Sequence, residues 1–163
     1  MDTPVSCREA TRQDISGVLR LYAQPELDNG KVLSGAEAER VFERIAAYPD
    51  YKIYVALCEG QIVGTFALLI MDNMAHMGAP SAVIEAVAVD PEWQGRGVGR
   101  LIMKYALQLC VEKGCYKAVL SSNLKRERAH AFYESLDFER HGYSYRISAQ
   151  PGSQLDAAQA ALR

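Results

Sequence analysis

The sequence lacks a long apolar run, and it has no strong excess of charge of either sign. Its longest apolar stretch, residues 62–71, is about half as long as a membrane span and is interrupted by a glycine and a threonine. The first ten residues carry Asp2, Arg8 and Glu9, which argue against a secretory signal peptide. A net charge of −2 and a pI near 5.9 give no electrostatic basis for binding nucleic acid or an anionic membrane. We therefore expect a soluble cytoplasmic protein that binds neither.

Cysteine is also scarce, and its spacing excludes the usual cysteine-based sites. The chain has 4 cysteines and no Cys-x-x-Cys pair. Cys58 and Cys110 fall within apolar periodic segments, where free cysteine behaves as a small hydrophobe. His76 and His130 are single histidines without a set of metal partners. We expect neither a disulfide framework nor a metal site.

No proline-, glycine- or serine-rich linker divides the chain, which predicts a single domain over residues 1–148. Residues 149–163 follow as an alanine-rich tail, either frayed or docked. Capping signals and helical periodicity predict helices from Thr11, from Ser34, over 98–112 and over 125–136. Apolar patterns and turn signals predict strands over 5–10, 52–58, 61–71, 81–89 and 116–121, and a closing hairpin over 138–141 and 143–147.

The most informative segment runs from Val83 to Arg100, where an apolar strand is followed by a glycine-rich turn and a helix. Such a turn exposes amide N–H groups at the positive end of a helix, which suits a phosphate or pyrophosphate. A Walker loop is excluded because Arg100 and Leu101 stand where lysine and a hydroxyl residue are required. The dinucleotide fingerprint is also incomplete, because the next apolar strand ends in Ser-Ser-Asn rather than an acidic residue.

Two motifs instead resemble a known family. Gln94-x-x-Gly97-x-Gly99, after a Val-Ala-Val strand, resembles the acyl-CoA loop of the GNAT superfamily of N-acyltransferases. Residues 129–138 are similar to the late helix of that family, in which a Phe-Tyr pair precedes a Gly-Phe at the start of the next strand. Asp137 replaces the usual glycine, and aspartate tolerates the left-handed conformation better than most side chains. The motifs span residues 83–138, and the order of elements extends the likeness to about residue 147.

The resemblance implies an α/β fold: a mixed, mostly antiparallel seven-strand sheet with helices on both faces and a parallel, splayed central strand pair. It implies transfer of an acetyl group from acetyl-CoA, with CoA as product, to a primary amine of a small molecule by direct attack on the thioester. A non-catalytic acyl-CoA-binding sensor or interaction domain is the alternative. The oligomeric state stays open, with a homodimer allowed.

The resemblance also implies which residues bind the cofactor. The backbone near Val87 and Val89 would pair with the pantetheine arm as an added strand does, while loop amides take the pyrophosphate. A basic cluster containing Arg128 would meet the 3′-phosphate of CoA, or else form a solvated face. The complete set is Val87, Ala88, Val89, Gln94, Gly95, Arg96, Gly97, Val98, Gly99, Arg100, Asn123, Arg128 and Phe132.

Two residues are candidates for the chemistry. Tyr133 would protonate the departing thiolate, although a tyrosine on an amphipathic helix can also be there for packing. Glu85 lies in an Ile-Glu-x-Val-x-Val pattern that resembles small-amine members such as glucosamine-phosphate acetyltransferases, where the acid orients or deprotonates the amine. A structural salt bridge is the alternative. Strand alternation predicts that Glu85 shares a face with Val83, Val87 and Val89.

The acceptor would be held by the loops over residues 24–31 and 72–80, since binding residues concentrate on loops. Glu26, Asp28 and Asp72 in these loops favour a small cationic amine over a peptide. The sequence does not identify that amine.

Overall fold

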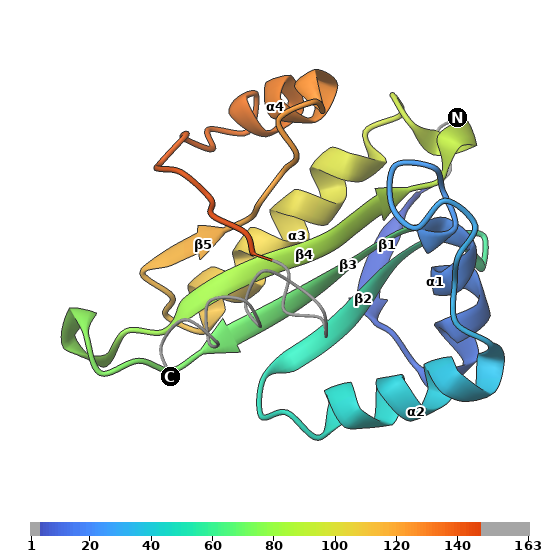
Figure 1. The fold of residues 1–163 in the computed structure, drawn as a ribbon, viewed down its shortest axis with the longest axis horizontal. Helices are drawn as coiled ribbons and strands as arrows, with labels where there is room; N and C mark the ends of the chain where they lie inside the picture. Colours follow the sequence, from blue (N-terminus) through green and yellow to red (C-terminus); the bar gives the residue numbers. More distant parts are fainter. Residues whose placement is uncertain (1–3, 148–163) are drawn as a thin grey trace, which may run out of the picture. The chain divides into compact units, whose positions relative to one another are not determined.

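A computed structural model describes residues 4–147, and its central feature is a five-stranded sheet in the order β1-β2-β3-β4-β5 (Figure 1). The strands are β1 (Ser6–Glu9), β2 (Tyr51–Cys58), β3 (Gln61–Met71), β4 (Ser81–Val89) and β5 (Lys117–Val119). Neighbouring strands are antiparallel except β4 and β5, which are parallel. The mixed, mostly antiparallel sheet and the parallel pairing of β4 with β5 are therefore as predicted. The predicted number of seven strands is wrong, and the parallel pair lies at the edge of the five-stranded sheet rather than at its centre.

Local sequence signals account for where the helices begin and end. The α-helices are α1 (Ile15–Tyr22), α2 (Gly35–Ala46), α3 (Val98–Glu112) and α4 (Glu127–Glu134), and short 3₁₀ helices are η1 (Arg12–Asp14), η2 (His76–Gly78) and η3 (Pro91–Trp93). At the start of α2 the Ser34 hydroxyl accepts from the Glu37 N–H, and the Glu37 carboxylate accepts from the Ser34 N–H, which is the predicted capping box.

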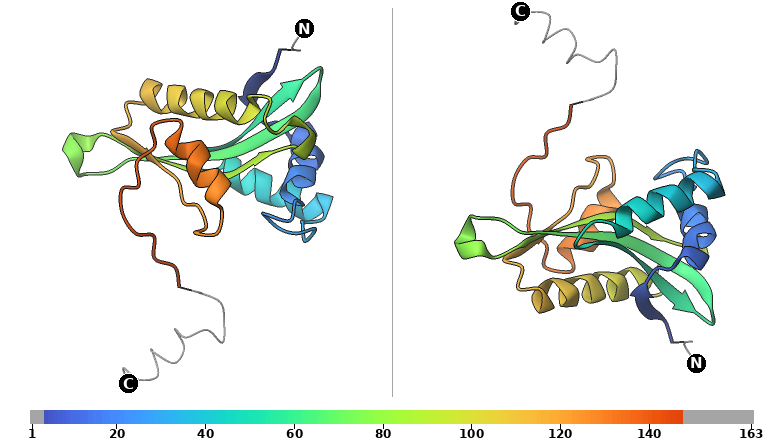
Figure 2. Two further views of the ribbon diagram at one scale, coloured as in Figure 1. Left: turned by 90° about the horizontal axis from the view of Figure 1, so that it is seen from above. Right: turned by 90° about the horizontal axis from the view of Figure 1, so that it is seen from below.

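Within residues 4–147 the fold divides after Leu120 into two units. The first unit contains the whole sheet, with α3 on one face and α1 and α2 on the other (Figure 2). The second unit contains α4. The predicted tail over residues 149–163 lies outside the described residues. No helix in the described part of the chain is long and apolar enough to cross a membrane.

Close packing fixes α3 on the sheet. Phe66, Ile102 and Met103 are fully buried between β3 and α3. Gly64 allows this approach, because a Cβ added there would lie 2.5 Å from Ile102 Cδ1 and 3.2 Å from Val98 Cγ1. The absence of a side chain at one position of β3 thus determines how near the N-terminal turn of α3 comes to the sheet.

The closing hairpin predicted over 138–141 and 143–147 is wrong, because none of these residues is in a strand. A hairpin is stable only when its strands have partners and a buried face. Here the side chains of Tyr143 and Tyr145 are 90% and 91% exposed, so alternating aromatic residues alone do not produce a ladder. An ion pair of 2.5 Å between Arg140 and Glu134 joins the start of this segment to α4 instead.

Candidate functional site

A β-bulge interrupts β4 in the middle of the predicted cofactor strand. Glu85 pairs with Ala67 and Ala88 with Thr65, so Ala86 and Val87 together lie opposite one residue of β3. Ala86 accordingly has a φ of +50°, which is uncommon for a residue with a side chain.

The inserted residue reverses the alternation of side chains beyond Glu85. Residues directly opposite one another in a sheet point to the same face, so Glu85 shares a face with Ala88, whereas Val89 lies with Gly64 on the other face. The prediction that Val89 shares the face of Glu85 is wrong for this reason. Glu85 itself lies on the face covered by α1 and α2.

The outer edge of β4 has no partner strand beyond its first three residues within the described part of the chain. Among the described residues, β5 pairs only with Ser81, Ala82 and Val83. The Asp90 N–H donates to the Val63 carbonyl at 2.9 Å, so antiparallel alternation directs the peptide groups of Val89 away from β3. The peptide groups of Ala88 face β3 by the same rule. The second half of β4 is therefore an edge to which an extended chain can add.

Two polar side chains from the α1 region hold the turn at the end of β4. Arg20 Nη1 lies 2.5 Å from Asp90 Oδ2, and its Nη2 donates to the Ile62 carbonyl at 2.7 Å. Burial of Asp90 raises its pKa, but hydrogen bonds from Arg20 and from the Glu92 amide outweigh burial and leave the pKa lowered. The Val89 carbonyl accepts from Gln24 Nε2 at 3.2 Å. Sequence reasoning missed Arg20 and Gln24, whose only signal is their spacing of four residues.

The glycine-rich loop between η3 and α3 is open where a phosphate must approach. Gly95 and Gly97 have φ angles of +75° and +83°, and a Cβ added at either would meet no atom within 4 Å. The first N–H groups of an α-helix have no intrahelical acceptor. No group within residues 4–147 accepts a hydrogen bond from the Val98 or Gly99 N–H. These donors at the positive end of a 15-residue helix fit the pyrophosphate of an acyl-CoA.

Gln94 and Arg96 also contact neighbouring groups at this turn. Gln94 Nε2 donates to the Val89 carbonyl at 3.3 Å, which joins the loop to the end of β4. The Arg96 guanidinium lies 5.3 Å from the ring centre of Trp93. The loop is therefore braced at its start, while its glycines remain uncovered.

Glu85 is exposed, and no described cationic side chain forms an ion pair with it. The salt-bridge interpretation of Glu85 thus has no partner within residues 4–147. An open carboxylate on a strand that also presents the cofactor edge is suited to contact a cationic or neutral amine.

The second unit contains the other candidate, Tyr133, near the end of α4. Its ring packs against Phe132 and Phe138, with ring centres 5.3 Å and 5.8 Å away. Burial raises the pKa of the Tyr133 phenol, and the nearby charge of Arg126 opposes this weakly. Tyr133 is therefore a protonated donor at neutral pH, as a general acid must be.

Asp137 adopts the left-handed conformation expected of it, with a φ of +64°. The Phe138 N–H donates to the Tyr133 carbonyl at 3.2 Å and the Asp137 N–H to the Glu134 carbonyl at 3.1 Å. This pair of bonds is a Schellman motif, so replacement of the usual glycine leaves the end of the helix in its normal form.

Asn123 organises the approach to α4. Its Oδ1 accepts from the Lys125 N–H at 2.9 Å, and its carbonyl lies 2.9 Å from His130 Nε2. Arg128 is exposed and Phe132 is half-buried on the same helix. The structure thus brings Glu85, residues 87–89 and residues 94–100 together in the first unit. Their union in one site with Asn123, Arg128, Phe132 and Tyr133 of the second unit stays a prediction.

Comparison with known proteins decides the family. The model of the acetyltransferase (GNAT) family matches residues 16–138. The chain belongs to the GNAT acetyltransferase family. It is 31% identical over 141 residues to the glucosamine 6-phosphate N-acetyltransferase of Trypanosoma brucei brucei, covering 86% of this chain and 92% of that protein.

Two further acetyltransferases match this chain over most of their own length. The L-amino acid N-acetyltransferase of Escherichia coli is 24% identical, and the match covers 92% of each chain. The crystal structure of a Trypanosoma brucei acetyltransferase matches with a TM-score of 0.78 and 28% identity, over 89% of this chain and 99% of that one. These matches confirm the predicted acyl-CoA-dependent N-acyltransferase, and GNAT acetyltransferases use acetyl-CoA as co-substrate.

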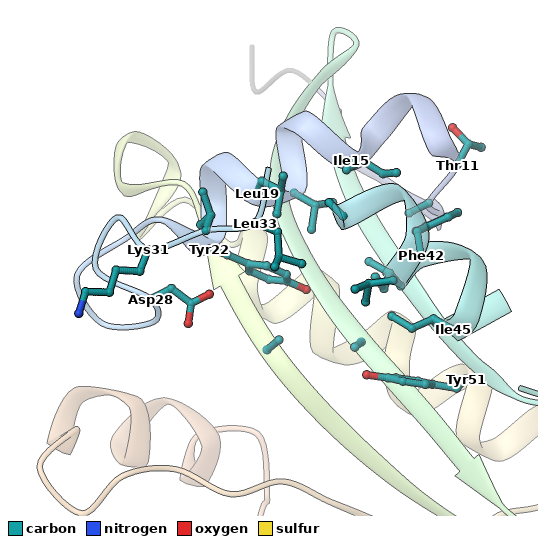
Figure 3. A pocket seen from close by; sticks show the side chains of 18 residues that line it. Thr11, Ile15, Leu19, Tyr22, Asp28, Lys31, Leu33, Phe42, Ile45 and Tyr51 are labelled. Carbon is teal, nitrogen blue, oxygen red and sulfur yellow. The ribbon is translucent and has the colours of Figure 1, made fainter. Parts of the chain in front are cut away.

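The GNAT fold of this chain also contains a cavity that sequence reasoning missed. It has a volume of about 380 Å³ and lies between α1, α2, the segment over residues 23–34 and the sheet (Figure 3). Its lining comes from six separate parts of the sequence, which no local motif indicates. The cavity lies on the sheet face that carries Glu85, since Ala67, the partner of Glu85, lines it.

Proposed function

We propose that this GNAT acetyltransferase transfers the acetyl group of acetyl-CoA to the primary amine of a small molecule by direct attack of the neutral amine on the thioester. The observation that carries the proposal is the open outer edge of β4, which runs directly into the Gly95–Gly97 loop and the N-terminus of α3. The edge can pair with the extended pantetheine arm, while the amides of Val98 and Gly99 receive the pyrophosphate.

In the proposed reaction the amine nitrogen bonds to the acetyl carbon as the carbon–sulfur bond breaks. Glu85 orients the amine and accepts its proton, directly or through water, because its carboxylate is open to solvent and has no described ion-pair partner. Tyr133 donates its phenolic proton to the departing thiolate, and burial supports this role by keeping the phenol protonated. Asn123, Arg128 and Phe132 complete the contacts with CoA.

The acceptor belongs to the class of small primary amines. Relatives of this chain are named for acetylating glucosamine 6-phosphate and L-amino acids, and both names denote small molecules with an amino group. Those names also support catalysis over acyl-CoA binding alone. Part of the loop over residues 24–31 lines the cavity beside β4, which supports its predicted role in holding the acceptor.

The test combines calorimetry with an assay of thiol release. We expect the full-length protein to bind acetyl-CoA and to release CoA thiol only when a suitable amine is added. Binding without thiol release across a broad panel of amines would favour the non-catalytic alternative. Failure to bind acetyl-CoA at all would overturn the proposed role of the β4 edge and the loop.

A further inference from the structure

The cavity beside β4 is apolar along most of its length. Side chains of α1 and α2, including Leu19, Phe42 and Ile45, form its inner part, and Ile53 of β2 contributes to its floor. A volume of about 380 Å³ is within the range of small-ligand sites and exceeds the voids that normal packing leaves in a core. This space can receive an apolar group larger than a few methylenes.

Several polar groups of the lining lie around Tyr22, and the exposed Asp28 marks the mouth of the cavity. The carboxylate of Asp28 and the hydroxyl groups of Tyr22 and Tyr51 belong to this lining (Figure 3), and both Asp28 and Tyr51 act electrostatically on the Tyr22 hydroxyl. Burial, opposed by a hydrogen bond with Thr65, raises the pKa of Tyr22 to about 12, so this hydroxyl is neutral at physiological pH. The cavity is therefore amphipathic, with an apolar interior and a mouth that carries a negative charge.

The polar mouth lies next to the proposed reacting amine. Glu85 pairs across the sheet with Ala67 and precedes Ala86 in the chain, and both alanines line the cavity. Both side chains are single methyl groups, so they add little bulk to the part of the floor next to Glu85. A molecule lying in the cavity can thus place one end within reach of Glu85.

The charge at the mouth discriminates between classes of amine. Asp28 is the acidic residue of the lining and Lys31 its basic residue, within the described part of the chain. The ammonium group of Lys31 points away from the cavity (Figure 3). A phosphate or carboxylate on the acceptor would thus meet Asp28 and Glu85 without a cation of the cavity lining directed at it, which is unfavourable for like charges.

We propose that this cavity binds the apolar body of the acceptor, and that the acceptor is an alkylamine or arylalkylamine without an anionic group beside its amine. The inference rests on the proposed acetyl transfer. In it the alkyl or aryl body lies against Phe42 and Ile45, and the ammonium group is attracted to Asp28. The ammonium group releases one proton to solvent, the neutral amine attacks, and Glu85 accepts the second proton as the amide forms.

The first experiment measures how affinity depends on the apolar body. Calorimetry with n-propylamine to n-hexylamine should show the affinity of the full-length protein rising by roughly fourfold for each methylene that enters the cavity. In thiol-release assays with acetyl-CoA, kcat/KM should rise in the same order and should exceed that for glucosamine 6-phosphate. Pentylamine should also be preferred to norleucine, which adds a carboxylate beside the same amine.

Variants test whether the cavity is the site. Ile45→Trp fills it from α2 and should remove the advantage of hexylamine over propylamine. Val111→Trp is the matched control, because Val111 is 77% exposed on α3 and that helix covers the opposite face of the sheet. Leu33→Trp, at a lining residue that is 44% exposed, provides a second filling variant if Ile45→Trp fails to fold. Asp28→Asn should weaken binding of hexylamine severalfold and leave binding of 1-hexanol unchanged.

The outcomes separate this inference from the proposed function. A rise in affinity with chain length that Ile45→Trp abolishes and Val111→Trp preserves supports the inference. Affinities that do not depend on chain length, or a preference for norleucine or glucosamine 6-phosphate, would overturn it while acetyl transfer stands. Absence of thiol release with every amine would instead reject the proposed function, and the calorimetric series would still decide whether the cavity binds apolar amines.

Discussion

Glu85 combines two properties that a core residue of a strand does not usually have. Its backbone is fixed by pairing with Ala67, immediately before the bulge, yet its side chain is exposed. An exposed carboxylate on a rigid strand keeps its position without the desolvation cost of burial. This arrangement suits a carboxylate that accepts a proton from an amine entering from solution and afterwards releases that proton to solvent.

We expect Glu85→Gln to lower turnover and to alter its pH dependence, with little change in affinity for acetyl-CoA, because the change removes the proton acceptor and keeps the shape. Steady-state rates between pH 6 and 9, together with calorimetry, check this. Glu112→Gln, at the far end of α3, is a control that should behave as wild type. A Glu85→Gln protein that melts earlier but retains full turnover per folded molecule would contradict the role in catalysis.

The proposed general acid, Tyr133, can be tested by removing a single atom. Tyr133→Phe removes only the phenolic oxygen, so the ring contacts with Phe132 and Phe138 should remain. Turnover should fall by roughly 10²–10⁴, the usual contribution of a general acid, and single-turnover experiments isolate this step. Wild-type single-turnover rates in the variant would show that the residue serves packing or cofactor binding.

Among the elements, the segment from β4 to α3 was the most predictable, because its signals are local. The sequence predicts β3, β4 and α3 with the bounds that the structure shows, and turn glycines or capping residues mark their ends. The candidate loop was predictable for the same reason, since Gly95 and Gly97 have positive φ angles.

Features that depend on distant partners could not be predicted. The bulge at Ala86 is defined by the register of β3 against β4, and no residue pattern within β4 announces it. The clamp of Arg20 on Asp90 joins residues 70 positions apart. The cavity behind Glu85 arises only when α1 and α2 pack over the sheet. The predicted hairpin over 138–147 was wrong for a related reason. Residues 143–147 alternate as a strand does, but a strand also needs a partner to pair with, and no residue of this segment is in a strand.

A substitution in the glycine-rich loop between η3 and α3 tests whether this loop binds acetyl-CoA. Gly97→Glu should abolish binding of acetyl-CoA, because it adds bulk and negative charge where the pyrophosphate must approach. It also places a side chain at a φ of +83°, at a cost of about 1–2 kcal/mol. Gly60→Glu is a matched control, since Gly60 has a φ of +81°, equally open surroundings and a place in the β2–β3 turn. Both variants should lose similar stability in urea titrations, and unchanged affinity in Gly97→Glu would exclude the loop.

For the molecule as a whole, two buried carboxylates tie the α1 region to the sheet. Asp90 joins α1 to the end of β4 through Arg20, and Asp14 joins η1 to β1 through Arg8. Arg8 donates two hydrogen bonds to Asp14, of 2.6 Å and 3.0 Å, and the Thr11 N–H donates a third of 2.7 Å. The hydrogen bonds from Arg8 outweigh the effect of burial, which raises the pKa, and those from Thr11 add to them, so the pKa of Asp14 falls from 3.8 to about 2.

The lowered pKa of Asp14 makes the free energy of unfolding depend on pH. A carboxylate with a depressed pKa in the folded state contributes its full stability above its unfolded value of 3.8 and loses it as the pH falls towards 2. The shift corresponds to about 2 kcal/mol, and solvent screening at the half-exposed Arg8 reduces this to about 1 kcal/mol.

Asp14→Asn should therefore lower the free energy of unfolding by about 1 kcal/mol at pH 7 and by progressively less below pH 4. Urea titrations at pH 7, 4 and 3 measure this difference, with the exposed Asp72→Asn as control. A deficit for Asp14→Asn that stays constant down to pH 3 would mean that its carboxylate charge is not the source of the stability.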